Sequence, residues 1–164
     1  MPDNHHEPKP LTEAQKKRAA DVKLVALRMK QYHDSDPVKV QRFVRVYTLA
    51  KSIGEMEKLS DEEQYDLELA AVVHDVRGDR IPVVRDILRE CGISDASAMH
   101  VCHMVENAEN YEHISTLDHQ ILVEAKLIVD FKEHNTPENE IIRKAEDIFI
   151  TNTGKLFLKR AFQL

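Results

Sequence analysis

The sequence contains little of what β-rich and disulfide-rich folds need. Its 164 residues include only four glycines, six prolines, two cysteines and no tryptophan. Turn-rich β folds use many glycines and prolines, and strand-like alternation of apolar and polar residues is hard to find in this chain. These scarcities favour an all-α fold. Because a chain of this length can bury one sizeable core, we expect a single domain.

The two cysteines, Cys91 and Cys102, are not spaced as a metal-binding or disulfide motif. Two thiols without such a pattern fit a reducing compartment, where each acts as a small core residue. The first ten residues are polar and lack the apolar centre of a signal peptide. We therefore expect a cytoplasmic location, with residues 1–10 as a disordered lead-in and residues 11–164 as one helical domain.

Positive charge and long apolar runs are also scarce. The formal net charge is -6, which argues against general binding to nucleic acids or to anionic membranes. No stretch approaches the about 20 apolar residues that a membrane-spanning helix needs. Neither a nucleic acid nor a membrane is expected as a partner.

Helical periodicity and capping signals recur along the whole chain. Apolar residues return every three or four positions, and several of these runs follow a Ser, Thr or Asp in an N-cap position. Gly54 and Gly92 stand where helices are expected to end. The sequence predicts seven or eight helices, which cover about residues 12–32, 37–53, 61–73, 82–91, 95–105, 117–131, 137–149 and 151–162.

The adjacent residues His74 and Asp75 follow the strongly apolar run at 67–73. An imidazole and a carboxylate can both coordinate a divalent cation. Burying both groups at the end of an apolar helix is costly unless they are paired or bound to a metal. The pair is therefore the first candidate for a functional site.

Around this pair the sequence resembles the HD-domain superfamily of metal-dependent phosphohydrolases, and most of all its small bacterial single-domain members. The resemblance covers about residues 30–164. It rests on four ordered segments: DPVKVQRFVRVYTLAKSIG (36–54), LAAVVHD (69–75), LDHQILVEA (117–125) and IFITNTG (148–154). It implies an all-α HD-type helical bundle. In that family an early histidine, the central His-Asp pair and a later aspartate hold a metal, which polarises a phosphoryl oxygen and acidifies the attacking water.

Only the central pair of that ligand set is present in this chain. The early histidine position, three residues before Arg45, holds Arg42, and the later aspartate position holds Lys126. Arginine and protonated lysine have no lone pair to offer a metal. Two remaining ligands are too few for a hard divalent ion. The resemblance thus implies a degraded metal site, with His74 and Asp75 as its remnants.

Three interpretations of these residues stay open. In the first, Arg42 and Lys126 occupy the place of the metal and pair with Asp75, so that the protein is non-catalytic and needs no cofactor. In the second, the same two cations, joined by Arg77 or Arg80, bind a phosphate-containing small molecule without cleaving it. The simpler alternative to this binding is that the basic residues are paired with Asp75 and Glu109.

The third interpretation is an active hydrolase. His74 and Asp75 would then hold Mn²⁺, Fe²⁺, Ni²⁺, Zn²⁺ or Mg²⁺, with Asp75 as the catalytic residue acting on a nucleotide or another small phosphate ester. Spare donors would complete such a site, namely His33, His103, Glu106, Glu109 and Asp130. His103 and Glu106 are three residues apart and share one face of a helix.

An interaction module is a hypothesis from a different class. A helical domain of this kind can bind a partner protein or form a homodimer through an exposed apolar surface. The predicted helix at 12–32 lies mostly outside the resemblance, and its apolar stripe is the first surface to examine.

Overall fold

The computed structural model describes residues 8–76 and 78–164, and this part of the chain is all-helical. Its helices are α1 (Glu13–Tyr32), α2 (Pro37–Met56), α3 (Asp61–Val73), α4 (Ile81–Glu90), α5 (Asp95–Glu106), α6 (Leu117–Glu133), α7 (Glu138–Ile148) and α8 (Asn152–Phe162). Two short 3-10 helices, Gly78–Arg80 and Tyr111–His113, lie in connections. The predicted all-α class with seven or eight helices is confirmed. Most of the expected lead-in at 1–10 lies outside the described residues.

Side-chain caps place several helix starts where the sequence predicts them. Thr12 and Gln15 form a capping box at α1, in which Thr12 Oγ1 accepts from Gln15 N at 3.1 Å and Gln15 Oε1 accepts from Thr12 N at 3.0 Å. Asp36, Ser60 and Ser94 cap α2, α3 and α5, and in each case the side-chain oxygen accepts from one backbone N–H of the first turn. Local sequence therefore determines these boundaries.

Gly54 does not end α2, contrary to the expectation from the sequence, because the helix continues to Met56. Gly54 is buried against α3, and a Cβ atom at this position would lie 2.9 Å from Leu67 Cδ2. The glycine thus permits close approach of two helices. Gly92 behaves as expected, with a φ of 80° just after α4.

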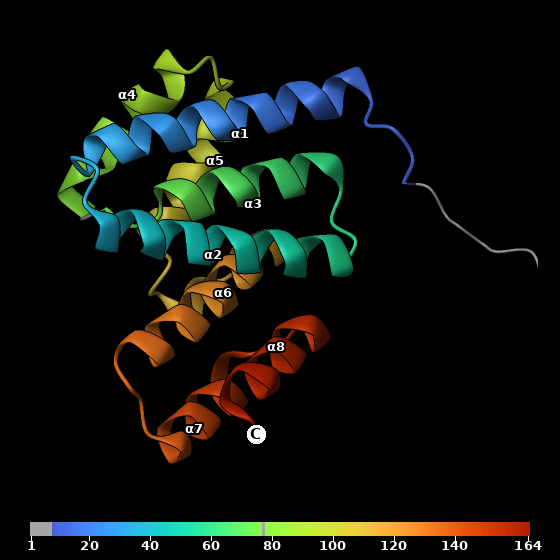
Figure 1. Cartoon of the computed structure of the whole chain (residues 1–164), viewed down its shortest axis with the longest axis vertical. Helices are drawn as coiled ribbons and strands as arrows, with labels where there is room; N and C mark the ends of the chain where they lie inside the picture. Colours follow the sequence, from blue (N-terminus) through green and yellow to red (C-terminus); the bar gives the residue numbers. More distant parts are fainter. Residues whose placement is uncertain (1–7, 77) are drawn as a thin grey trace, which may run out of the picture.

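The helices form two groups around two apolar clusters. Helices α1, α3 and α2 lie side by side, and α6 follows on the other side of α2 (Figure 1). With α4 and α5 they enclose the main core, to which α1 contributes Val22, Val25 and Met29. The second cluster joins the later part of α6 to α7 and α8. The apolar stripe of α1 therefore packs on its own domain. None of the described helices combines the length and hydropathy that a membrane crossing requires.

Glu124 on α6 is a fully buried carboxylate that fixes the start of α8. Its Oε2 accepts from Ile150 N at 3.1 Å and Thr151 N at 3.2 Å, and its Oε1 accepts from Thr151 Oγ1 at 2.6 Å. Gln120 Nε2 donates to the same carboxylate at 2.6 Å. A Cβ atom on Gly154 would clash with Glu124 Oε1. The carboxylate thus accepts from three donors at the N-terminal end of α8 and from Gln120 of its own helix, and glycine at position 154 makes room for it.

Candidate functional site

His74 and Asp75 lie just after the last residue of α3. His74 is only 6% exposed, and its Nδ1 donates to the carbonyl oxygen of Ala71 at 2.7 Å. Burial lowers the pKa of His74 to about 4, so the ring is neutral at pH 7. With the proton on Nδ1, the lone pair of the neutral ring is on Nε2.

Arg42 on α2 bridges Asp75 and Glu133. Its Nη1 lies 3.2 Å from Asp75 Oδ2, and its Nε lies 3.1 and 3.0 Å from the two carboxylate oxygens of Glu133. The side chains of Arg42, Asp75 and Glu133 are 32%, 28% and 19% exposed. The hydrogen bond with Glu133 raises the pKa of Arg42. The expected contact of Arg42 with Asp75 is therefore present, with Glu133 as a second partner.

Lys126 on α6 pairs with other carboxylates than the expected Asp75. Its Nζ donates to Glu109 Oε1 at 2.7 Å and lies 4.0 Å from Asp130 Oδ2. No ion pair between Lys126 and Asp75 occurs in the described part of the chain. The expectation was wrong because Glu109, which follows α5, and Asp130, one turn along α6, offer nearer partners. The charge of Lys126 still acts on His74, whose pKa it lowers further.

Sequence reasoning missed Glu133, although a signal for it exists. Lys126, Asp130 and Glu133 are spaced four and then three residues apart, so they share one face of α6. If Lys126 belongs to a site, Asp130 and Glu133 are therefore expected to lie beside that site. Burial raises the pKa of Asp130, against the opposing effect of Lys126.

The other proposed donors are dispersed. His33 is buried at the C-terminal end of α1. Burial lowers the pKa of His33, and this effect is larger than the opposing effect of the Asp75 charge. Glu109 and Asp130 pair with Lys126. His103 and Glu106 line a separate pocket between α4 and α5. Of the two further arginines, Arg80 is exposed in the short helix Gly78–Arg80, and Arg77 lies outside the described residues.

These side chains do not fit a divalent metal ion. Nowhere in residues 8–76 and 78–164 are three His, Cys, Asp or Glu side chains grouped to hold one. Asp75 already accepts a hydrogen bond from a guanidinium, which has no lone pair and repels a cation. The side chains around Arg42 are therefore not arranged as a metal site.

The carboxylates around Arg42 and Lys126 also oppose the binding of an anion. Arg42 and Lys126 carry two positive charges, whereas Asp75, Glu133, Glu109 and Asp130 are four acidic groups around them. An incoming phosphate would have to displace these partners from both cations. The arrangement can thus hold α2, α3 and α6 together, and it offers poor conditions for a second anion.

Comparisons with known proteins give no family assignment: no family model, no curated protein and no solved structure matches this chain. The resemblance to the HD-domain superfamily therefore stays a prediction from the sequence.

Proposed function

We propose that this protein is a non-catalytic, metal-free relative of the HD-domain phosphohydrolases. It acts by binding a ligand or a partner protein and not by hydrolysis. The observation that supports the proposal is the bridge from Arg42 to Asp75 and Glu133. By the resemblance, Arg42 stands at the position of a metal-ligating histidine. Its guanidinium supplies the positive charge that a metal would otherwise supply to Asp75.

The physical reason lies in the cost of burying charge. A partly buried carboxylate needs a cation or several hydrogen-bond donors. Arg42 meets this need for Asp75 and for Glu133 at once, because its planar guanidinium presents Nε and Nη1 in fixed directions. A metal ion could bind Asp75 only if the Arg42 guanidinium gave up its hydrogen bond to this carboxylate. The guanidinium would then lack its partner and would repel the incoming cation. The network is therefore assigned a structural role, and binding to a ligand or partner is assigned to other surfaces.

Elemental analysis by plasma mass spectrometry tests this proposal. The full chain and its His74→Ala variant are incubated with Mn²⁺, Fe²⁺, Ni²⁺ and Zn²⁺, desalted, and compared. We expect no difference in retained metal between the two proteins. The comparison removes any contribution from His5 and His6, which both proteins share. About one equivalent of metal that is lost on His74→Ala would contradict the proposal and support the active phosphohydrolase instead.

A further inference from the structure

Helix α1 has an inner face that the domain covers and an outer face that it leaves exposed. Val22, Val25 and Met29 on the inner face are buried, whereas Leu24 and Leu27 on the outer face are 45% and 52% exposed. The helix lies along an edge of the molecule, with α3 on its inner side (Figure 1). Two exposed leucines alone do not define a binding site, because apolar side chains are common on protein surfaces. The residues around them decide what this face can bind.

The outer face of α1 follows the seven-residue repeat of a coiled-coil helix. In the heptad notation abcdefg, Leu24 occupies an a position, and Ala20 and Leu27 occupy d positions. All the g positions of the helix hold lysine, and the other a positions hold polar residues; these are Lys16, Lys23, Lys30, Lys17 and Gln31. Every one of these residues is exposed. A seam this narrow fits one partner helix, whereas a helix that lies on a membrane needs a broader apolar face.

The positive charge of α1 exceeds the negative charge that contacts it. Four of its six basic side chains each pair with one carboxylate: Lys16 with Glu13, Lys17 with Asp21, Arg18 with Asp61 and Arg28 with Glu90. The other two, Lys23 and Lys30, form no ion pair with a described residue, and Asp34, the next acidic residue after Lys30, is no exception. Two lysines beside the leucine seam are therefore left for an acidic partner.

A second copy of this chain is a poor partner for this face. If two α1 helices paired antiparallel, their g positions would meet, so that lysines would face lysines. If they paired parallel, each g position would face an e position of the other helix, which places Lys23 against Arg28 and brings the two Lys17 side chains together in the seam. Like charges disfavour both arrangements. The complementary partner is a different helix with acidic residues beside its apolar stripe.

We infer that the outer face of α1 binds an acidic amphipathic helix of another protein, with apolar side chains against Leu24 and Leu27 and carboxylates against Lys23 and Lys30. The apolar contacts supply affinity, and the lysines select the charge of the partner. The inference rests on the proposed binding function and names its partner. The metal analysis of His74→Ala does not involve α1, so failure of the metal-free proposal and failure of this inference give different results.

Fluorescence anisotropy with labelled peptides tests this inference on the full chain. The acidic probe is a helical peptide of about three heptads with leucine at a and d and glutamate at e and g, where the repulsion between glutamates keeps it from pairing with itself. The basic probe has lysine in place of every glutamate. We expect the acidic peptide to bind and the basic peptide not to bind. Absence of acidic-peptide binding, or equal binding of both peptides, would overturn the inference.

Substitutions on α1 test which residues make the contact. Lys23→Glu/Lys30→Glu should weaken binding of the acidic peptide about tenfold or more, because each substitution removes an attraction and adds a repulsion, and it should allow the basic peptide to bind. Leu24→Ser/Leu27→Ser should weaken acidic-peptide binding by a similar factor, since it removes the apolar contact. All four residues are exposed, so the variants should keep the fold. Unchanged binding in both variants would place the peptide elsewhere and overturn the inference.

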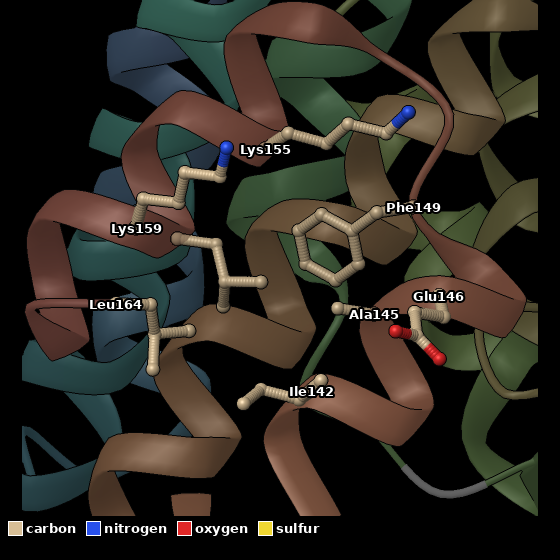
Figure 2. A pocket seen from close by; sticks show the side chains of 8 residues that line it. Ile142, Ala145, Glu146, Phe149, Lys155, Lys159 and Leu164 are labelled. Carbon is tan, nitrogen blue, oxygen red and sulfur yellow. The ribbon is translucent and has the colours of Figure 1, made fainter. Parts of the chain in front are cut away.

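Lys155 and Lys159 on α8 provide the matched control for the charge reversal. They lie one turn apart beside an apolar pocket between α7 and α8 (Figure 2), and α8 lies at the opposite end of the molecule from α1 (Figure 1). The variant Lys155→Glu/Lys159→Glu changes the net charge as much as the α1 variant does, and it should bind the acidic peptide as the original chain does. An equal loss in both variants would show an effect of net charge alone and overturn the assignment to α1.

Other occupants of the outer face would give different results. Size-exclusion chromatography with light scattering would detect a dimer, and a dimer that Leu24→Ser/Leu27→Ser dissociates would assign the face to a second copy of the chain. Cosedimentation with vesicles of phosphatidylcholine and phosphatidylserine in equal parts would detect membrane binding. Vesicle binding that is lost in the same variant would assign the face to an anionic membrane. We expect neither result, and either one would overturn the inference.

Discussion

Arg42 connects three helices through one side chain, because its partners Asp75 and Glu133 come from the end of α3 and from α6. The guanidinium is about one third exposed, so water screens part of each interaction. Arg42 is important because its positive charge compensates the two carboxylates of Asp75 and Glu133.

Replacing the two cations should reveal whether they stand in for a metal. The double variant Arg42→His/Lys126→Asp restores the ligand types that the resemblance implies, beside the existing His74 and Asp75. We expect Mn²⁺ binding by this variant in isothermal titration calorimetry, and none by the original chain. The single variant Arg45→His, one turn along α2, is the control. A folded double variant without Mn²⁺ binding would show that the geometry of a metal pocket is lost.

His74 should make stability depend on pH in a defined window. Its pKa is about 4 in the folded protein against 6.5 for an ordinary histidine. Between these values the unfolded chain binds a proton that the folded chain does not, so the free energy of unfolding falls as the pH decreases from about 6.5 to 4. The loss from this residue is roughly 3 kcal/mol at most.

Urea denaturation at a series of pH values measures this dependence. The variant His74→Asn keeps a donor for the Ala71 carbonyl but cannot titrate. We expect it to be less stable near neutral pH because it fills less space, and to lose less stability on acidification. Parallel curves for the two proteins between pH 6.5 and 4 would show that His74 is not buried in its neutral form.

At the scale of elements, the sequence identifies helices well and their mutual contacts poorly. Caps such as Thr12 and Ser60 are local, so the sequence is enough to place them. Gly54 was misread as a helix end because its role depends on Leu67, thirteen residues away, which packs against it. The role of Glu124 likewise depends on distant residues, since three of its four hydrogen-bond donors belong to Ile150 and Thr151, 26 and 27 residues further on.

The candidate site follows the same pattern. The contact between Arg42 and Asp75 could be predicted because the resemblance places both residues around one point. The sequence also favours pairing of the basic residues with Asp75 and Glu109 over anion binding, and the ion pair between Lys126 and Glu109 agrees with that alternative. Glu133 was within reach of sequence reasoning through its spacing from Lys126 on α6.

The contact between α6 and α8 should be sensitive to one methyl group. Gly154→Ala places a Cβ atom against Glu124 Oε1 and 2.7 Å from Thr151 Oγ1. Because alanine favours helices by about 1 kcal/mol over glycine, any net loss reports the clash. We expect a loss of about 2 kcal/mol or more in urea denaturation, as for other overpacked sites.

Gly78→Ala is the matched control, because a Cβ atom at that position would have no described atom within 4 Å apart from its own chain neighbours. Its stability should change by less than about 0.5 kcal/mol, which is usual for surface substitutions. Equal effects of the two substitutions would show that α8 does not approach Glu124 as closely as described.

The whole molecule consists of a large core that contains α1 to α6 and a smaller cluster built on the later part of α6. Because the apolar stripe of α1 faces α3, this helix belongs to the large core and does not offer that stripe to a partner. Arg42 on α2 connects the two parts, because Asp75 follows α3 of the large core and Glu133 lies at the end of α6, which carries the small cluster.

The hydrogen bonds from Ile150 and Thr151 to Glu124 have a kinetic consequence for α7. The chain on both sides of α7 is anchored to α6, yet α7 itself buries only Ile141. Its backbone amides should therefore exchange with deuterium by local opening, well before those of α6 and α8, which wait for larger unfolding events. Hydrogen-exchange mass spectrometry at neutral pH measures this order.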